Sequence, residues 1–430
     1  MPAGTDIMTH SPVTIHPDPS RTVIRPFVVS DPTGFDHQAV PRVERIADRV
    51  LAMHQDTVDF ELNRVMTDIG SRHHDFEEVV LRRFETVKGQ CGQDEIPADR
   101  ARLIGAYFSQ EYAFEAAALF NPSMVPHDDQ TGAPDGGIRF VVSLRGIGEG
   151  HLSSVTFRTG SWCPQGGFAV DPPSRFGVTP TIEEGDDASD GTICVNFNDS
   201  QDPSETVLFP VTEAQQAGIE DMRLVRLIED DGQVRHLGTY TAYSGSAARC
   251  ELMEAVDYKR CTLTRMTGAA AERKGIAIFP RKVGGRYAAL GRQDNENIWF
   301  LQSDSLTDWG SGTKIIAPLH FWEFVQMGNC GSPIEIDEGW LVLTHGVGSV
   351  RNYCIGAALL DKDDPTTVLG RMALPLVHPS LDERDGYVPN VVYSCGGIVH
   401  DRMLLLPYGV ADGFTAFAHC PVDDLLAVLR

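Results

Sequence analysis

The chain lacks the signals that place a protein in or across a membrane. No apolar run approaches the ~20 residues needed to cross a bilayer, and the first twenty residues contain neither the basic nor the apolar segment of a secretory signal. The nine cysteines are scattered and include no CxxC pair, a pattern typical of reduced thiols. We therefore expect a cytoplasmic protein that does not bind membranes.

Basic residues are scarce compared with acidic ones. The chain has 36 Lys and Arg against 60 Asp and Glu, which gives a formal net charge of −24. Nucleic acids bind to basic surfaces, so this composition argues against a nucleic-acid partner. It does not exclude a small anionic substrate, because an acidic surface can enclose a locally basic pocket.

Several motifs of catalytic and cofactor chemistry are also missing. The chain has no HExxH, no pair of histidines four residues apart beside an acid on a helix, and no cluster of cysteines, so we expect no metal and no cofactor. It has no GxGxxG between a strand and a helix and no GxxxxGK[ST], which disfavours nucleotide binding. The GxSxG turn of the serine hydrolases is absent as well.

The first part of the chain divides into an extended arm and a helical region. Frequent prolines predict an arm without helices over residues 1–40. Residues 41–120 place apolar side chains at helical spacing and predict an α-helical extension. Within it, Asp75 and Glu78 form an expected capping box for a helix over Phe76–Val87, and a last helix is expected over Ile96–Phe120.

The remaining residues, 121–430, have the pattern of an all-β domain. Short runs of Val, Ile, Phe, Tyr and Thr alternate with Gly, Asp and Asn turns, which suits a barrel, a pair of sandwiches or a propeller. At ~45 to 60 residues per blade, this length holds five or six propeller blades. The segment 162–203 is rich in Pro and Gly and contains an acidic run, and we interpret it as an insertion, either a lid or a disordered excursion.

The segment Gly218–Gly245 is the most informative stretch. It places Glu220 and Asp221 at the start of a strand, followed by an Asp-Asp-Gly turn and a second strand that contains Tyr240. A hairpin that holds a carboxylate at its entrance suits a catalytic acid on a rigid scaffold. The alternative is an ordinary solvated hairpin, since acidic residues are common at strand ends. Because side chains alternate along a strand, Glu220 is expected to point away from Asp221.

Other polar residues stand near the ends of predicted strands. Each alone is typical of a solvated or structural side chain, but together they could supply donors to sugar hydroxyls or a phosphate around a carboxylic acid. The set consists of Asn121, Arg145, His151, Arg158, Lys274, Arg281, Lys282, Arg292, His345 and Asp412.

The order of motifs along the chain resembles glycoside hydrolase family 130, which contains β-mannoside phosphorylases and related β-mannosidases. The resemblance covers about Asn121 to Arg430 and is carried by NP, GIEDMR, TYTAY, FPRK, GSPI, VLTHGV, ERDGYVPNVVYSCG and YGVAD. The helical region is similar to that of the longer members, which act on β-1,2-linked oligomannosides. The resemblance implies an all-β five-bladed β-propeller with an N-terminal α-helical extension, and a site in the central depression.

The resemblance also implies roles for individual residues. Asp221 matches the general acid of a Glu-Asp-Pro-Arg motif, with Met222 in place of the proline. Asn121, Arg145 and Asp412 match positions that hold the sugar next to the scissile bond, and His151 and Tyr240 are taken as further sugar contacts. Phosphate contacts are expected from the following cationic or imidazole side chains: Lys274, Arg292, Arg249 and His345. Many members have a histidine where this chain has Gly291, so one phosphate contact is either missing or supplied by His345.

These assignments lead to a function with two alternatives. A β-mannoside phosphorylase needs one acid and a set of cations that hold phosphate, whereas an inverting β-mannosidase needs a second carboxylate to activate water. One prominent acid among lysines and arginines favours phosphorolysis of β-1,2-linked manno-oligosaccharides, with phosphate as co-substrate. The alternative from a different functional class is a propeller that binds carbohydrate without catalysing a reaction. The apolar face of the helical region predicts a homodimer through that region.

Overall fold

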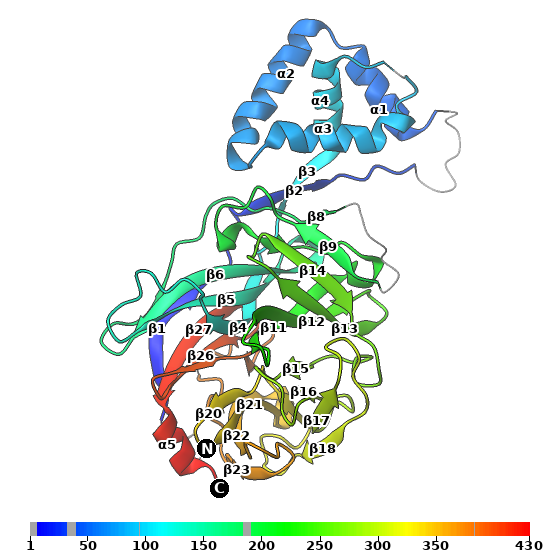
Figure 1. Ribbon diagram of the computed structural model, residues 1–430. Coiled ribbons are helices and arrows are strands. Elements are labelled where there is room, and N and C mark those ends of the chain that lie inside the picture. Colours follow the sequence, from blue (N-terminus) through cyan, green and yellow to red (C-terminus); the bar gives the residue numbers. More distant parts are fainter. Residues whose placement is uncertain (1–6, 32–39, 94, 184–190, 382) are drawn as a thin grey trace.

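The computed structural model of the protein describes residues 7–31, 40–93, 95–183, 191–381 and 383–430. The strands form one large body, and the α-helices α1 to α4 form a separate layer that the ribbon of β2 and β3 joins to it (Figure 1). Among the described residues, no helix has both the length and the apolar composition needed to span a membrane.

The first and last long strands of the chain are neighbours in one sheet. The 5-stranded sheet has β1 (Thr9–Ile15) at its edge, antiparallel to β27 (Phe414–Pro421). Its other strands are β26 (Met403–Val410), β25 (Ile398–His400) and β24 (Val392–Tyr393). Part of the segment predicted as an extended arm is therefore a strand that attaches the N-terminal residues to the end of the chain.

The largest sheet has 11 strands and two halves. The first half contains β4 (Ala118–Pro126), β5 (Ile138–Ile147), β6 (Ser153–Cys163), β7 (Gly167–Val170) and β10 (Val207–Leu208). The second half contains β11 (Gly218–Ile228), β12 (Val234–Tyr243), β13 (Ala248–Ala255), β14 (Arg260–Arg265), β9 (Ile193–Asn196) and β8 (Thr181–Ile182). The halves meet where Gly218 pairs with Ser153, and the predicted hairpin over Gly218–Gly245 is confirmed as β11 and β12.

Two smaller sheets follow along the chain. The 4-stranded sheet consists of β15 (Ala277–Ile278), β16 (Tyr287–Gly291), β17 (Ile298–Ser303) and β18 (Thr313–Ile316). The 5-stranded one consists of β19 (Gln326–Asn329), β20 (Ile334–Ile336), β21 (Gly339–Val347), β22 (Tyr353–Leu360) and β23 (Val368–Arg371). A short helix, α5 (Val422–Val428), ends the chain.

The helical layer contains α1 (Arg42–Leu51), α2 (Gln55–Asp68), α3 (Phe76–Val87) and α4 (Ala98–Tyr107). The bounds predicted for α3 are confirmed, but the capping box is wrong: Asp75 has a left-handed backbone and its side chain makes no capping hydrogen bond. The last predicted helix, Ile96–Phe120, is also too long. It ends at Tyr107, and β3 (Ser109–Ala113) pairs with β2 (Thr22–Pro26).

The predicted insertion at 162–203 packs beneath the helical layer. The His74 ring lies over Phe176 with 4.0 Å between centroids, and Arg175 donates to the Ser71 carbonyl at 3.1 Å. The same insertion supplies β7, β8 and β9 to the large sheet. Its described part therefore connects the helical layer to this sheet, whereas the acidic run at 184–190 lies outside the described residues.

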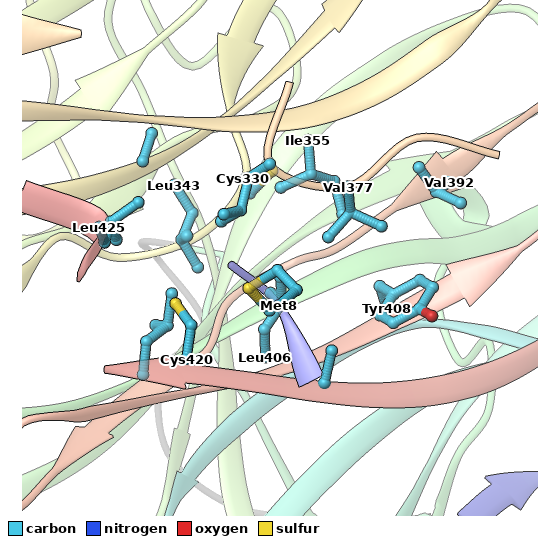
Figure 2. Close-up of a cluster of buried hydrophobic side chains, with 14 of the residues drawn as sticks. Met8, Cys330, Leu343, Ile355, Val377, Val392, Leu406, Tyr408, Cys420 and Leu425 are labelled. Carbon is cyan, nitrogen blue, oxygen red and sulfur yellow. The ribbon is translucent and has the colours of Figure 1, made fainter. Parts of the chain in front are cut away.

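Apolar side chains from distant segments meet in the core of the C-terminal sheets. Figure 2 shows Met8, from the N-terminal segment, among Leu343, Ile355 and Leu406. All four side chains are buried. Burying a side chain of this size contributes ~1.5–3 kcal/mol, so this cluster fixes the N-terminal segment against β21, β22 and β26.

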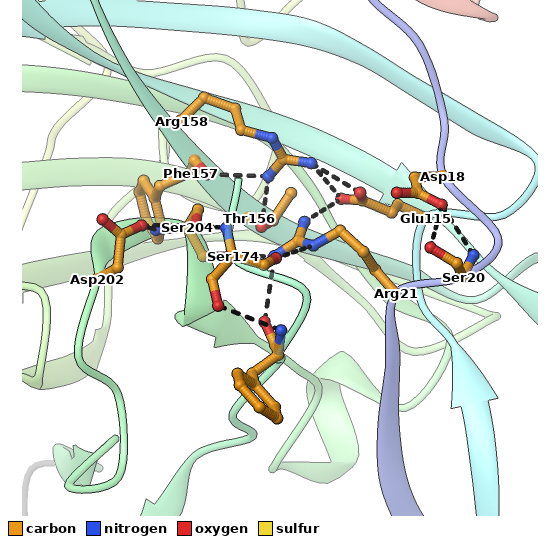
Figure 3. Close-up of polar contacts among 11 residues, drawn as sticks. Asp18, Ser20, Arg21, Glu115, Thr156, Phe157, Arg158, Ser174, Asp202 and Ser204 are labelled. Atoms are coloured by element: carbon orange, nitrogen blue, oxygen red, sulfur yellow. Dashed lines mark hydrogen bonds and ion pairs between the residues drawn. The ribbon is translucent and has the colours of Figure 1, made fainter. Parts of the chain in front are cut away.

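A buried charge cluster holds the start of the chain against the large sheet (Figure 3). Glu115 accepts two hydrogen bonds from Arg158 at 2.7 and 2.9 Å and an ion pair from Arg21 at 2.9 Å. Arg21 also donates to the carbonyls of Ser174 and Ser204. Since these charges are fully buried, each depends on the others for the interactions that water would otherwise provide.

We expect Glu115→Gln to lower the free energy of unfolding by about 3–5 kcal/mol, because it removes the carboxylate with which two buried arginines pair directly. Urea unfolding measures the change. The matched control is Glu61→Gln, which removes a surface pair with Arg64 and should change stability far less. Equal effects of the two substitutions would contradict this role of Glu115.

Candidate active site

Two β-bulges position the central polar residues. The pairing of β4 with β5 is interrupted between Phe120 and Ser123, and that of β11 with β12 between Glu220 and Arg223. Asn121 and Asp221 lie in these interruptions with positive φ angles of 49° and 53°. A bulge redirects a side chain, and Asn and Asp tolerate the left-handed conformation better than most residues. The local sequence therefore permits a backbone that turns both side chains toward each other.

The two bulge residues are in direct contact. Asn121 donates from Nδ2 to Asp221 Oδ1 at 2.7 Å, and the Arg145 guanidinium lies 3.3 Å from the same oxygen. Three residues that sequence analysis assigned to the site, from three different strands, thus meet at one carboxylate. Asn121 and Asp221 are both buried.

Glu220 does not point away from this group, so that expectation was wrong. Its carboxylate pairs with Arg145 at 2.8 Å and with Lys274 at 3.7 Å. The alternation of side chains along β11 fails here because the bulge inserts an extra residue into the ladder. Arg145 therefore bridges Glu220 and Asp221.

The guanidinium of Arg223 holds the backbone of Asp221 in place. It donates to the Asp221 carbonyl, to the Cys330 carbonyl and to the Tyr393 hydroxyl, each at 2.8 Å. These partners come from three different sheets or their connections. The buried arginine therefore fixes the left-handed backbone of Asp221 relative to the rest of the centre.

Cations around Asp221 control its ionisation. Burial alone raises the pKa of this carboxyl, but Arg145, Arg223 and Lys274, together with the Asn121 donor, outweigh it and hold the pKa below its usual range. Asp221 is therefore a carboxylate at neutral pH in the ligand-free protein. To donate a proton, it must first gain one as ligands bind.

Asp412 has the opposite shift. Burial and the neighbouring charge of Asp221 raise its pKa to about 6, against the opposing effects of Arg145 and Arg351. Asp412 also has a positive φ of 49°. The site thus contains three carboxylates, of Asp221, Glu220 and Asp412, rather than the single prominent acid expected from the sequence.

A cationic group lies next to these carboxylates. The Arg292 Nη1 lies 3.0 Å from His345 Nε2, and Asn329 donates to the carbonyl of Gly275, the residue after Lys274, at 2.8 Å. A Cβ on Gly275 would lie 2.3 Å from Arg292 Nε, so the glycine provides the space for this side chain. Burial and Arg292 lower the pKa of His345, which keeps its ring neutral. Two of the four residues expected to bind phosphate, Arg292 and His345, are thus in contact, and the backbone next to a third, Lys274, packs against Arg292.

Arg249 and Tyr240 form a different cluster. The Tyr240 hydroxyl donates to Glu251 at 2.8 Å and accepts from Gln215 at 3.0 Å, and Arg249 pairs with Glu251 at 2.7 Å. Tyr240 is fully buried among apolar side chains of the large sheet. The structure therefore does not place Tyr240 where a sugar could contact it, and Arg249 pairs with Glu251 in this cluster rather than with Arg292.

His151 lies at the surface, in the turn between β5 and β6. Its Nδ1 is 3.2 Å from the Tyr387 hydroxyl. Sequence analysis missed Tyr387, the roles of Glu220 and Arg223, and Arg351, whose charge acts on Asp412. A signal for Arg351 was present: GIGEGHL after Arg145 and GVGSVRN after His345 have the same form, so His151 and Arg351 occupy matching positions.

Several buried polar atoms at the centre have no hydrogen-bond partner among the described residues. They are Asn121 Oδ1, Arg145 Nε, Arg292 Nε and Asn329 Oδ1. A buried polar atom without a partner is costly, so such a set indicates a polar ligand or bound water. In the described part of the chain, no group of three or more His, Cys, Asp or Glu residues is arranged to hold a metal ion.

Comparisons with known proteins show which sequences this chain resembles. A family model described as β-1,4-mannooligosaccharide phosphorylase matches residues 182–430. A 1,2-β-oligomannan phosphorylase from Thermoanaerobacter sp. (strain X514) is 34% identical over 225 residues, which are 50% of this chain and 72% of the relative. A β-1,2-mannobiose phosphorylase from Listeria innocua is 35% identical over 231 residues, 52% of this chain and 63% of the relative.

Solved structures support the same fold. The structure of β-1,2-mannobiose phosphorylase from Listeria innocua with β-1,2-mannobiose aligns with a TM-score of 0.53 at 22% identity, over 74% of this chain and 93% of that one. A putative glycoside hydrolase from Bacteroides ovatus aligns with a TM-score of 0.53 at 22% identity, over 75% of this chain and 91% of that one. The strand-rich body therefore has the fold of these proteins.

We expect Asp412→Asn to stabilise the ligand-free protein at neutral pH. Because the folded-state pKa of Asp412 is raised to about 6, its contribution to stability is fully present below the unfolded-state pKa near 4 and is lost as the pH rises through 6. The substitution should raise the free energy of unfolding by about 1–3 kcal/mol at pH 7.5, with a gain that shrinks toward pH 4. Urea unfolding at three pH values measures this, and a gain independent of pH would contradict the shift.

Proposed function

The chain belongs to glycoside hydrolase family 130, and on that premise we propose that it catalyses inverting phosphorolysis of β-mannosides. The substrate class is β-1,2-linked manno-oligosaccharides, as the names of the first relatives suggest. The products are α-mannose 1-phosphate and an acceptor shortened by one sugar. Phosphate is a co-substrate, and the proposal includes no cofactor.

One observation carries this proposal: the charge of Lys274 acts on the Asp221 carboxylate, and the next residue, Gly275, packs against Arg292, which contacts His345. Phosphorolysis needs an acid for the leaving oxygen and a nucleophilic anion on the opposite face of the sugar. Phosphate is already nucleophilic, so the protein needs only to hold and orient it with cationic donors. Arg292, whose Nε is buried without a partner among the described residues, supplies such a donor.

Asp221 is the proposed general acid, and Asn121 and Arg145 are proposed to hold the sugar next to the scissile bond together with Asp412. Asp221 can act as an acid only if the positive charge around it is partly neutralised. Arg145, Arg223 and Lys274 keep Asp221 ionised in the free protein. A phosphate bound at Lys274 and Arg292 offsets part of that positive field, which favours protonation of Asp221. Proton donation and phosphate binding are therefore linked at this site.

An inverting β-mannosidase is the second candidate, and the additional carboxylates favour it. A hydrolase of this type uses a second carboxylate to activate water. Glu220 is held by Arg145 and Lys274, which leaves Asp412 as the carboxylate with a raised pKa.

Incubation of the protein with β-1,2-mannobiose, with and without phosphate, decides between these reactions: phosphate-dependent mannose 1-phosphate supports phosphorolysis, and free mannose supports hydrolysis. Binding without either product supports a carbohydrate-binding protein.

The five-bladed architecture is part of the proposal. The two halves of the 11-stranded sheet are joined by one parallel pair, Gly218 with Ser153, as neighbouring blades would be. Counting these halves separately, with the 4-stranded and two 5-stranded sheets, gives five units. Residues 41–120 then form the helical extension to a propeller.

We also propose a cytoplasmic homodimer. All nine cysteines are free thiols in the structure, as reducing conditions would keep them. The helical layer exposes large apolar side chains, among them Phe60 and Tyr107, and these are the proposed contact. Light scattering of Phe60→Asp should show a monomer, whereas a dimer of unchanged strength would place the contact elsewhere.

We expect Lys274→Ala and Arg292→Ala to raise the Michaelis constant for phosphate much more than that for the mannoside, because each removes a cation from the proposed phosphate site. Initial rates of mannose 1-phosphate release at varied phosphate concentration measure the effect. Lys282→Ala is the control, since its ammonium pairs with Glu229 and Asp230 instead. Equal changes for both substrates would refute the assignment.

We expect Asp221→Asn to lower the turnover number by about 10² to 10⁴-fold, since the amide keeps the shape of the site but cannot donate a proton. Calorimetry should still detect binding of the oligosaccharide. Glu220→Gln is not a neutral control, because it removes a partner of Arg145 and Lys274. Glu229→Gln, at the residue that follows the end of β11, is the suitable control. Near-normal turnover of Asp221→Asn would exclude it as the acid.

A further inference from the structure

Two surface turns of the same form follow the strands that carry the site. The turn after β5 contains Gly148 and His151, and the turn after β21 contains Gly348 and Arg351. Each begins three residues after a central side chain, Arg145 or His345, and each is closed by a backbone hydrogen bond, from Gly148 to Leu152 at 3.1 Å and from Gly348 to Asn352 at 2.9 Å.

In both turns, a residue with a polar side chain has a positive backbone φ angle, which residues other than glycine rarely adopt. His151 has a φ of 60° and Arg351 a φ of 52°. Below the first turn, the buried Tyr112 donates its hydroxyl to the Glu149 carbonyl at 2.9 Å, which fixes the backbone beside His151. Left-handed residues persist only where their surroundings enforce them, and they are concentrated at functional sites. The turns therefore present His151 and Arg351 in fixed positions.

An exposed tyrosine joins the first turn to the centre. The Tyr387 hydroxyl lies 3.2 Å from His151 Nδ1, their ring centroids are 5.9 Å apart, and Tyr387 is 55% exposed. The residues on either side of Tyr387 pack on Ala411: Val388 donates to its carbonyl at 2.9 Å, and a Cβ on Gly386 would lie 2.5 Å from its Cβ. Ala411 directly precedes Asp412, so Tyr387 lies beside the turn that carries this carboxylate.

The second turn meets the same segment. Asn352 donates to the Asn390 side chain at 3.0 Å, and the Tyr353 N–H donates to the Asn390 carbonyl at 3.2 Å. The guanidinium of Arg351 lies 5.8 Å from the Tyr353 ring, and its charge acts on Asp412. Tyr387 and Arg351 thus both lie near Asp412, and His151 joins them through its contact with Tyr387.

We propose that His151, Tyr387 and Arg351 form a subsite for the leaving part of the oligosaccharide, beyond the two sugars that flank the scissile bond. This inference rests on the proposed function. A pyranose ring presents an apolar face, which packs on aromatic rings, and a rim of hydroxyls, which accept from imidazole and guanidinium donors. The exposed rings and the cation supply both kinds of contact.

The charge at this surface selects the ligand class. Arg351 and Asp412 have opposite signs, so the local field favours a neutral polar ligand over an anion. The direction fits as well. The polar floor made by Asn121, Asp221 and Arg145 is buried, so a chain longer than two sugars must continue toward the exposed side, where Tyr387 lies.

The test compares chain lengths. Initial rates with phosphate on β-1,2-mannobiose and β-1,2-mannotetraose give the ratio of kcat/KM for the longer over the shorter substrate. In Tyr387→Ala this ratio should fall about fivefold or more, the size expected for loss of one aromatic contact. Tyr387→Phe keeps the ring and should retain most of the ratio. Leu369→Ala removes a similarly exposed apolar side chain from the edge strand β23, outside the proposed subsite, and is the control.

Calorimetry with mannotetraose in the absence of phosphate tests the subsite apart from catalysis. Weaker binding to Tyr387→Ala than to wild type, by about the same factor, supports the subsite even where wild type releases no mannose 1-phosphate, an outcome that would refute the proposed reaction alone. An unchanged kcat/KM ratio in an active Tyr387→Ala variant, unchanged binding, or no binding of mannotetraose to wild type would each overturn the subsite.

Discussion

The buried guanidinium of Arg223 is the contact on which the centre of the molecule depends. Its three hydrogen bonds reach β11, the segment after β19 and β24. In this way one side chain fixes the relative positions of three sheets and holds the Asp221 backbone in its left-handed conformation. Hydrogen bonds from a charged donor to buried acceptors contribute about 1.5–3 kcal/mol each, so the strain of the bulge at Asp221 is offset where it arises.

A second buried cluster performs the same task at the outside of the large sheet. Glu115 lies between β3 and β4, and its partners Arg21 and Arg158 come from the N-terminal segment and β6. Arg21 then binds the carbonyls of the insertion at Ser174 and Ser204. Buried ion clusters are expensive to form, but they permit few alternative arrangements. The cluster therefore holds the N-terminal segment, the insertion and the large sheet in one defined arrangement.

The sequence predicted helices and strands better than it predicted which way individual side chains point. Alternating β-branched residues and an Asp-Asp-Gly turn were sufficient for the β11–β12 hairpin, because that pattern is local. The strand β1 was missed because its partner β27 lies at the other end of the chain. Tyr240 and Glu220 were misplaced for two different reasons. β12 is covered on both faces, so its alternation does not identify the face of the site, and β11 contains a bulge that no local residue signals.

The charge of the site is opposite to that of the whole chain. The protein carries a formal charge of −24, yet three cations, Arg145, Arg223 and Lys274, act on the Asp221 carboxylate. In the ligand-free protein, Lys274 and Arg145 both form ion pairs with Glu220. An anion bound at Lys274 competes with Glu220 for that cation and also weakens the field that keeps Asp221 ionised. In the proposed reaction, a single event, the arrival of the anion, would therefore supply the nucleophile and prepare Asp221 as the proposed acid, which a neutral water molecule could not do.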